Sequence, residues 1–581
     1  MKILQVAHGY PPHALAGVEV YTRWFALTLA GSHTVQVFST RQAPDQEDLS
    51  LVEEVHDGIP VTFLINNFTR YDPILEVRHE EIARRFGAFL DRTGPDLVHF
   101  QHLIKLSTTL LDACKARNIP TVLTLHDYWF LCPVITLLQR DLALCSAPGD
   151  LEACTRCEVA TSYLNQEEAG TYYIAGMLEA MTDPARWAAL ADIYRGRFNP
   201  VYSTGDLTGP AISTLRIGLI RRFMRDRLEV ADALASPSRF LKDILEHHGL
   251  ASGRIRHLPN GIETGALLSC GTPPPPPPLK VLYLGTINKH KGVHVLIEAA
   301  NQLEALPVEV SIHGTGPDTR YESYIRSLVR NPRIRFGGRY DRADLPALLG
   351  SHHVVVMPST WYENHPIVIR EAFAAGVPVV APDLGAIPEA VQDGRDGLLY
   401  EAGNPDALAE TLQRFLEDPG LLGRLQDGIQ PVLSLADHIA RYELLYEDAV
   451  ARNAAHVNET HPHRILLCGP SSSTAGFAET LGDLLIAGDR LPRPRVFHLG
   501  EAGDLDAPLQ DFIPRLGMED VVNQISDLDA LSASGSPDLA VFLPGCDPDG
   551  KLERRLESSS TPVMLSPLTV KTITQQLRST S

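Results

Sequence analysis

Short apolar runs alternate with longer amphipathic stretches along most of the chain. In the first part of the sequence, residues 3–6, 35–39, 97–100 and 121–125 form apolar runs of strand length, separated by proline, glycine or helix-like sequence. Alternation of this kind is typical of βαβ units. The pattern therefore predicts an α/β fold, with a parallel sheet covered by helices.

Six consecutive prolines at residues 273–278 interrupt this alternation. A proline run cannot lie inside a helix or a central strand, and it favours a stiff, extended spacer of roughly 3 Å per residue. A new apolar run begins directly afterwards, at residue 280. We therefore predict a first domain at residues 1–270, a polyproline linker at 271–278 and a second domain that starts at 279.

The second domain repeats the scheme of the first. Its predicted strands are residues 280–285, 308–313, 334–337, 354–357 and 377–381, and helical sequence from 405 to about 450 closes a domain of residues 279–452. A polar stretch, 453–463, reads as a linker. Four further apolar runs (464–469, 495–500, 539–544 and 562–566) predict a small α/β domain at residues 463–581, whose role the sequence does not indicate.

Composition and charge narrow the classes of partner. The chain has 581 residues, is 44% hydrophobic and carries 51 basic against 71 acidic side chains, a formal charge of −20. This balance argues against nucleic acid as the main partner, although a local lysine and a helix N-terminus can still bind a small anion. No run of roughly 20 apolar residues suggests a membrane span. The polar start and the eight cysteines predict a cytoplasmic protein with reduced thiols.

The most informative stretch is residues 358–380. A predicted strand ends at 357, and a helix is expected to begin near Pro366, a residue suited to the first helical turn. Free backbone N–H groups and the positive end of the helix dipole there can bind a phosphate. Glu363 lies before this helix start and Glu371 lies inside the helix. One carboxylate can meet a ligand at the helix end and the other can reach a diol, although Glu371 taken alone could equally be a solvated helix residue.

This stretch resembles the signature of the family 4 retaining glycosyltransferases of the two-Rossmann-domain (GT-B) type, in which two glutamates are separated by seven residues. The resemblance extends over roughly residues 1–450. It also includes residues 11–12, 17–19, 126–127, 236–238, 259–261, 291–292, 314–316 and the Gly-Val-Pro-Val run at 376–379. An isolated pair of glutamates would be weak evidence, whereas this ordered set is specific.

The resemblance implies two Rossmann-like domains that face each other across a cleft, with the small C-terminal α/β domain in addition. The donor, a UDP- or GDP-linked sugar, would lie mainly on residues 279–435, and a glycan or lipid-linked acceptor mainly on 1–270. The implied reaction is metal-independent transfer of the sugar to a hydroxyl with retention, without a cofactor, in cell-surface or exopolysaccharide synthesis.

The resemblance also implies individual roles. Glu371 would bind the ribose hydroxyls, Glu363 the transferred sugar and Lys291 the leaving diphosphate, whose growing negative charge preorganised donors stabilise. His126 would lie at the reacting face of the sugar. The implied catalytic residues are His126, Glu363 and Lys291, and the implied donor-binding residues are Gly17, Thr286, Lys291, Glu363, Asn364, His365, Pro366, Ile367 and Glu371; Pro366 has no N–H to donate.

Thr286 departs from the family pattern, which usually has an arginine after the glycine of this strand. Threonine cannot offer a cationic fork, so Lys289 or His290 would have to substitute. The departure leaves open a catalytically degraded module that binds nucleotide sugar or a protein partner. An epimerase or phosphorylase on the same fold is a further alternative.

Two residues of the first domain allow two interpretations each. Gly17 is expected in a loop between the first strand and a helix that starts near Val20, where it would let backbone approach the donor, or simply form a tight turn. Asp127 would either set the tautomer of His126 or cap a turn.

Two further features stay open. Cys132, Cys145, Cys154 and Cys157 could bind a structural zinc ion or be buried thiols. A basic amphipathic helix at residues 215–225 could lie on anionic lipid at the inner face of the membrane, or pack on its own domain with solvated arginines.

Overall fold

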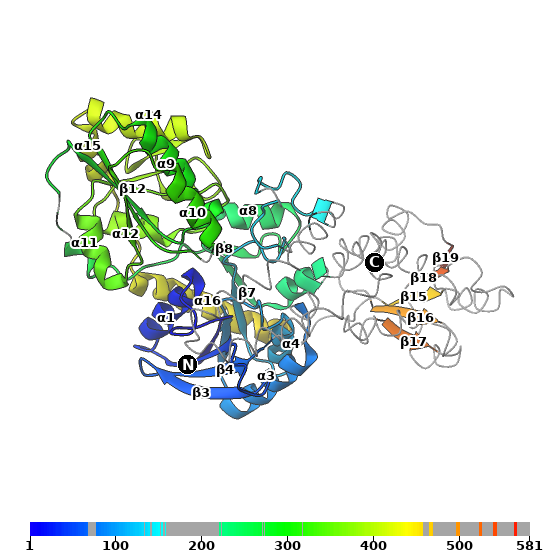
Figure 1. The fold of residues 1–581 in the computed structure, drawn as a ribbon. Coiled ribbons are helices and arrows are strands. Elements are labelled where there is room, and N and C mark those ends of the chain that lie inside the picture. Colours follow the sequence, from blue (N-terminus) through cyan, green and yellow to red (C-terminus); the bar gives the residue numbers. More distant parts are fainter. Residues whose placement is uncertain are drawn as a thin grey trace.

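The computed structural model describes two domains built on largely parallel sheets and the strands of a third sheet (Figure 1). The described residues are 1–67, 77–132, 134–139, 142–150, 153–154, 157, 220–221, 223–269, 271, 273–316 and 318–456, together with the backbone of strands at 464–468, 495–499, 522–525, 539–542 and 563–565.

The first sheet has eight strands in the order β3-β4-β2-β1-β5-β6-β7-β8, and every pair is parallel except the antiparallel β3–β4 edge. Four of its strands coincide with the predicted ones to within two residues at either end. The bounds are β1 (Lys2–Val6), β2 (Thr34–Arg41), β3 (Leu51–His56), β4 (Ile59–Ile65), β5 (Leu97–Phe100), β6 (Thr121–Thr124), β7 (Ala233–Ser236) and β8 (Ile255–His257).

Helices α1 (Gly17–Leu29), α3 (Glu80–Thr93), α4 (Thr109–Lys115) and α8 (Arg239–His247) accompany this sheet. The central strands β5 and β6 are buried along their whole length, as expected for a parallel sheet covered on both faces. Helix α3 is amphipathic, since Ile82, Phe86 and Leu90 lie in the core while its glutamates and arginines form ion pairs outside.

The second sheet is entirely parallel, in the order β11-β10-β9-β12-β13-β14. Its strands are β9 (Leu279–Leu284), β10 (Val308–His313), β11 (Ile334–Gly338), β12 (Val354–Val356), β13 (Val379–Pro382) and β14 (Gly397–Tyr400). Its helices are α9 (Val293–Gln302), α10 (Thr319–Leu328), α11 (Leu345–Gly350), α12 (Ile367–Ala374), α13 (Ile387–Ala390), α14 (Pro405–Glu417) and α15 (Leu421–Gly428), with short 3-10 turns η1 (Leu267–Ser269), η2 (Lys289–Lys291) and η3 (Arg342–Asp344).

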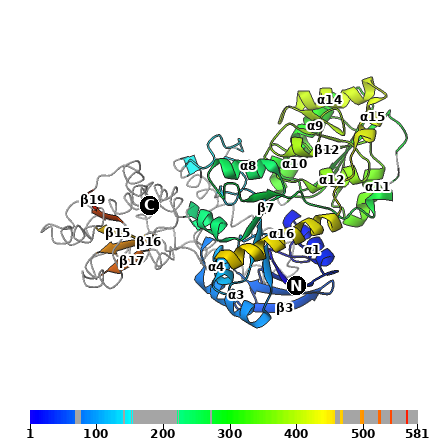
Figure 2. The ribbon, with the colours of Figure 1, turned by 180° about the vertical axis from the view of Figure 1, so that it is seen from behind.

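Helix α16 (Leu435–His456) leaves the second domain and packs on the first. Figure 2 shows it lying along the N-terminal sheet beside α1. Its buried Tyr442 hydroxyl lies 2.8 Å from Thr124 Oγ1, and its buried Tyr446 hydroxyl lies 2.9 Å from His99 Nδ1. Helix α16 therefore returns onto the first domain and ties the two domains together.

The third sheet is parallel and has the order β17-β16-β15-β18-β19. Its strands are β15 (Arg464–Cys468), β16 (Arg495–Leu499), β17 (Val522–Ile525), β18 (Leu539–Phe542) and β19 (Val563–Leu565), four of which overlap the predicted runs. The α/β class and the two parallel-sheet domains are thus confirmed. Within the described residues, no helix combines the length and apolar character that crossing a bilayer requires.

Candidate functional site

The loop between β12 and α12 supplies the centre of the candidate site. Helix α12 begins at Ile367, directly after Pro366 as the sequence predicts, and no side chain caps its first turn. The first N–H groups of a helix have no partner within the helix, and they carry the positive end of its dipole. An anion at this end would therefore meet unsatisfied donors.

Glu363 and Lys291 form an ion pair beside this helix start. The Nζ atom of Lys291 lies 2.7 Å from Glu363 Oε1, and the Ser359 hydroxyl donates to the same oxygen at 2.6 Å. Glu363 is only 6% exposed. Burial alone would raise the pKa of Glu363, but the Lys291 ammonium and the hydrogen bonds outweigh burial and lower it. The carboxylate is therefore ionised at neutral pH.

Two neighbouring loops hold Lys291 in place. The backbone N–H of Thr360 donates to the carbonyl of His290 at 2.9 Å, which joins the β12–α12 loop to η2. Gly292 follows Lys291 with φ +70°, and a Cβ there would stand 1.9 Å from the Pro358 carbonyl oxygen. Only glycine fits this close approach. The Lys291–Gly292 pair of the sequence thus places an amine against the loop that carries Glu363.

Glu371 forms a second acidic–basic pair one turn into α12. Its Oε1 accepts from Arg342 Nη1 at 3.1 Å, and the Arg342 guanidinium also lies 3.9 Å from the centre of the Trp24 ring in α1. Burial raises the pKa of Glu371 to about 7, and Arg342 only partly opposes this. Arg342 thus links the glutamate of the second domain to the first domain. The interpretation of Glu371 as a solvated helix residue is wrong, because it is only 8% exposed.

His126 follows β6 and lies in a buried polar cluster of the first domain. Its Nε2 lies 2.9 Å from Gln101 Oε1, and the Gln101 amide in turn donates to Gln5 Oε1 at 2.9 Å. Burial, reinforced by neighbouring His102, lowers the pKa of His126 to about 3. The imidazole is therefore neutral at physiological pH and can donate or accept a hydrogen bond without carrying charge.

Asp127 does not orient His126. Its Oδ2 pairs with His102 Nε2 at 2.9 Å, and its Oδ1 accepts from the Trp129 N–H at 2.9 Å. Of the two interpretations of Asp127, turn capping is therefore confirmed. The side chain that contacts the His126 ring is the Gln101 amide, through His126 Nε2, and not a carboxylate.

Asn364 joins the two halves of the site. Its side-chain amide donates to the His126 carbonyl at 2.8 Å, and its oxygen accepts a hydrogen bond from the Ser238 hydroxyl. His365, the next residue, has both ring nitrogens buried without a hydrogen-bond partner. Buried polar atoms are normally paired, so an unpaired imidazole at the helix start fits a ligand-binding role. The residues 363–365 and His126 therefore lie together at the junction of the domains.

The structure places Gly17 in a helix and Thr286 in the loop after β9. Gly17 is exposed and is the first residue of α1, so the expectation of a loop there is wrong. A Cβ at Gly17 would meet nothing within 4 Å, so close packing does not require glycine. Thr286 is exposed, and its carbonyl accepts from Tyr283.

The two proposed substitutes for the missing arginine differ in charge and placement. Lys289 is exposed. Burial, aided by Lys291, lowers the pKa of His290 to about 4, so this imidazole is uncharged at neutral pH and cannot replace a guanidinium. Its ring instead contacts Trp361, with centroids 5.0 Å apart.

The cysteines do not form a metal cluster among the described residues. Among those residues, one group of three His, Cys, Asp or Glu side chains brings its ligand atoms within 4.8 Å of one another, namely His13, Glu54 and His56. Burial raises the pKa of Cys154, and it raises that of Cys132 to about 12. The buried-thiol interpretation therefore fits Cys132 and Cys154 best.

The basic stretch 215–225 lies partly outside the described residues. Of its described part, Ile220, Phe223 and Met224 are buried in the first domain's core, and the Arg78 guanidinium lies 5.5 Å from the Phe223 ring centre. Its apolar face therefore packs on the domain.

Sequence reasoning missed Arg342, Gln101 and the side-chain role of Asn364. Arg342 is the first residue of η3, the 3-10 turn that follows β11, and a basic residue soon after a strand was the available signal. Gln101, which directly follows β5, gave a weaker signal in the sequence. The contact of Asn364 with the first domain left no local trace, because its partners lie more than 120 residues away.

Comparison with known proteins assigns both domains. Residues 278–418 match the family model "Glycosyl transferases group 1", and residues 15–147 match "Glycosyltransferase Family 4". The chain is 34% identical over 191 residues to a phosphatidyl-myo-inositol mannosyltransferase of Mycobacterium leprae, and 30% identical over 199 residues to a glycogen synthase of Mycobacterium tuberculosis. These matches cover 32% and 33% of this chain, and 49% and 48% of the relatives, so the chain spans about half the length of the curated relatives it matches.

Among solved structures, a sucrose-phosphate synthase from Thermosynechococcus elongatus superposes with a TM-score of 0.50 at 18% identity, covering 78% of this chain and 99% of that one. At this identity the likeness bears on the fold alone. Together with the two family models, it identifies residues 15–147 and 278–418 as family 4 glycosyltransferase (glycosyl transferases group 1) domains, arranged in the GT-B fold.

Proposed function

We propose that the chain transfers a sugar from a UDP- or GDP-linked donor to a hydroxyl acceptor with retention of configuration. The observation that carries this proposal is the Lys291–Glu363 ion pair, 2.7 Å across, beside the uncapped start of α12. A partly buried amine and free helix N–H groups in one place suit a diphosphate. The mycobacterial relatives, named as a mannosyltransferase and a glycogen synthase, support sugar transfer as the reaction class.

In this proposal the diphosphate lies at the amides of Asn364, His365 and Ile367, and Lys291 turns from Glu363 toward it. As the C1–O bond breaks, negative charge grows on the leaving diphosphate and positive charge on the sugar ring. Preorganised donors stabilise the former, and the ionised Glu363 carboxylate stabilises and orients the sugar. We assign no nucleophile, and a metal-independent reaction without a cofactor is part of the proposal.

The neutral His126 imidazole serves as a hydrogen-bonding group at the sugar, because protonation is unfavourable at its buried position. Glu371 binds the ribose hydroxyls once Arg342 has left it. Gly17 and Thr286 keep their proposed places at the edge of the donor.

The acceptor is a glycan or a lipid-linked sugar, and we place the reaction in the cytoplasm, at the inner face of the membrane, in cell-surface or exopolysaccharide synthesis. The domain boundaries at 270, 279, 452 and 463 belong to the same proposal. A rival function is a degraded GT-B module that binds nucleotide sugar or a protein partner; exposed Thr286 favours it.

Thermal unfolding of the full chain with UDP, GDP or ADP tests donor binding first. A nucleotide at about 100 times its Kd should add about 2.7 kcal/mol of stability. Consumption of the matching nucleotide sugars, with and without glycan acceptors, then separates the functions. Acceptor-dependent consumption supports a transferase; nucleotide binding without any consumption supports the degraded module; failure of all three nucleotides to bind overturns the donor site.

A further inference from the structure

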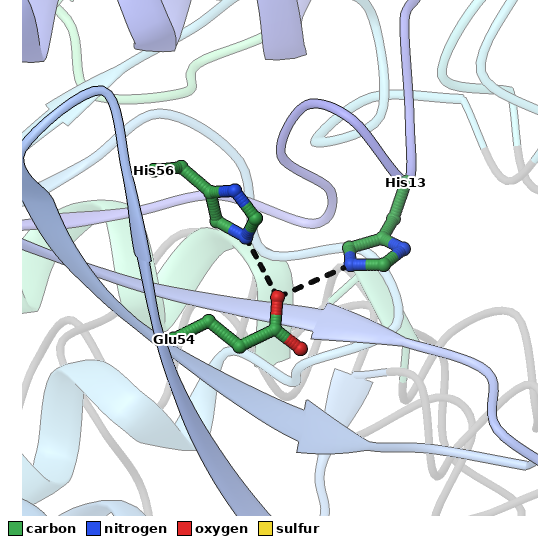
Figure 3. Close-up of side chains that lie close together, drawn as sticks. All are labelled: His13, Glu54 and His56. Atoms are coloured by element: carbon green, nitrogen blue, oxygen red, sulfur yellow. Dashed lines mark hydrogen bonds and ion pairs between the residues drawn. The ribbon is translucent and has the colours of Figure 1, made fainter.

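A compact group of two histidines and one glutamate lies apart from the donor residues, at the edge of the first sheet. Glu54 and His56 are two positions apart on β3, so both side chains lie on the same face of that strand. His13 comes from the loop between β1 and α1. Figure 3 shows the two imidazoles pointing at the same carboxylate oxygen from different segments of the chain.

The distances between these side-chain atoms suit the binding of one shared metal ion. His13 Nε2 lies 3.4 Å from Glu54 Oε2, and His56 Nε2 lies 2.6 Å from the same oxygen. Two ligand atoms about 2.0–2.1 Å from a tetrahedral zinc ion stand about 3.3 Å apart. The first pair already has this spacing, and the second needs to open by under about 1 Å.

The surroundings of these three side chains suit a metal ion of borderline softness, such as zinc. The side chains are 34% (His13), 26% (Glu54) and 23% (His56) exposed, so the group is reachable but partly shielded. The Phe63 ring makes edge contacts with both imidazoles, with centroids 5.1 and 6.0 Å away, and limits their movement. Arg41 Nη2 holds the second carboxylate oxygen at 3.1 Å, which leaves Oε2 as a single ligand atom.

We propose that His13, Glu54 and His56 form a site for one zinc ion, bound through two imidazole nitrogens and one carboxylate oxygen, with water in the fourth position. Two histidines and a carboxylate are a common zinc ligand set. The site is structural: it fastens the loop that carries His13 to the β3–β4 edge. The same loop carries His8, which pairs with Glu19 at 3.2 Å and contacts the His102 ring, so the ion anchors one end of the polar cluster around His126.

Cobalt(II) titration of the metal-stripped full chain tests the site, because cobalt reports its ligands in the visible spectrum. Sites with cysteine ligands add intense thiolate charge-transfer bands, whereas a His–His–Glu site gives only ligand-field bands. We expect one equivalent of cobalt with ligand-field bands and no associated thiolate band, displaced by zinc. His56→Asn and Glu54→Gln should each weaken this binding by more than roughly 100-fold, beyond the effect of an outer contact.

His247→Asn is the matched control, because His247 is an exposed histidine of the same domain outside the cluster, and it should keep the wild-type affinity. Circular dichroism of the metal-stripped variants checks that they fold. If His56→Asn does not fold, Glu54→Gln still tests the site, because glutamine keeps the shape of the glutamate side chain. The same cobalt stoichiometry and affinity in wild type and Glu54→Gln would overturn the proposal. The proposal would also be overturned if the wild type bound no cobalt without a thiolate band, because the three side chains would then be a hydrogen-bonded cluster only.

Discussion

The two halves of the candidate site differ in charge. On the second domain, Glu363 pairs with Lys291 and Glu371 with Arg342, so acidic and basic side chains face each other at 2.7 and 3.1 Å. On the first domain, burial lowers the pKa of His99 and His126, and these imidazoles are held by a glutamine, a threonine and a tyrosine. The second domain therefore contributes acidic–basic pairs, of which Glu371 ionises only near pH 7, whereas the imidazoles of His99 and His126 in the first domain are neutral.

This difference suits the two parts of a glycosyl donor. In the proposed function, a diphosphate takes its cations and N–H donors from the second domain, where Lys291 and Arg342 pair with carboxylates. A sugar ring and an acceptor hydroxyl need hydrogen bonds without net charge, which neutral imidazoles and amides offer. The comparison therefore predicts different consequences for substitutions in each half.

The largest effect is expected at Glu363. Replacing it by glutamine leaves the shape but removes the charge that opposes Lys291 and faces the sugar. Turnover of whichever UDP- or GDP-sugar the wild type consumes should fall roughly 10³-fold, the upper range for one preorganised electrostatic group. Steady-state kinetics measure this. Glu309→Gln, at an exposed position on β10, is the control and should behave as wild type; equal rates in both variants would break the charged half of the comparison.

His126→Asn should lower turnover by roughly 10²–10³-fold while nucleotide affinity stays unchanged, because the imidazole belongs to the neutral half. Kinetics and calorimetry on the same preparation separate the two quantities. A pH–rate profile adds a check: with a pKa of about 3, His126 should produce no inflection near pH 6.5. Weaker nucleotide binding with unchanged turnover would contradict this prediction, because His126 would then act on the nucleotide and not on the sugar.

Glu371 should make the protein less stable as pH rises. Its pKa is about 7 in the folded protein against an ordinary 4.5, so the folded state binds the proton more tightly than the unfolded state. The stability advantage over Glu371→Gln is then greatest below pH 4.5, falls between 4.5 and 7, and stays constant above. The full change is up to about 3 kcal/mol. Thermal unfolding of both proteins from pH 4.5 to 8 measures it, and an advantage that grows with pH would mean that Arg342 outweighs burial.

The smallest effect is expected at Tyr442, whose hydroxyl lies 2.8 Å from Thr124 Oγ1 and ties α16 to the first domain. Tyr442→Phe keeps the ring and removes this contact, and should cost about 1 kcal/mol of stability. Denaturant unfolding measures the loss, and nucleotide affinity should not change. A change in nucleotide affinity with no loss of stability would mean that this contact acts in the donor site and does not fasten α16 to the first domain.

The sequence predicted the architecture well because buried parallel strands leave continuous apolar runs, as at Leu97–Phe100 in β5. It missed the β3–β4 hairpin, since residues on β3 such as Glu53 and His56 break the apolar run at a partly exposed edge. The strands β7 and β8 are short and were not recognised either.

Within the site, the sequence predicted the helix start after Pro366 and the presence of Lys291 and Glu363, since both belong to local motifs. It could not predict that Lys291 touches Glu363, because 72 residues separate them and the contact depends on the close approach at Gly292. Arg342 was missed for the same reason: its partners Glu371 and Trp24 come from distant segments, one of them in the other domain.

The most direct test is the affinity of the best-binding nucleoside diphosphate for wild type, Lys291→Ala and Lys289→Ala, measured by calorimetry on the full chain. Both lysines lie in η2, but only Lys291 reaches Glu363. The charged-half account predicts at least about tenfold weaker binding for Lys291→Ala, about 1.4 kcal/mol, and a much smaller change for exposed Lys289→Ala. Equal affinities for wild type and Lys291→Ala would contradict it.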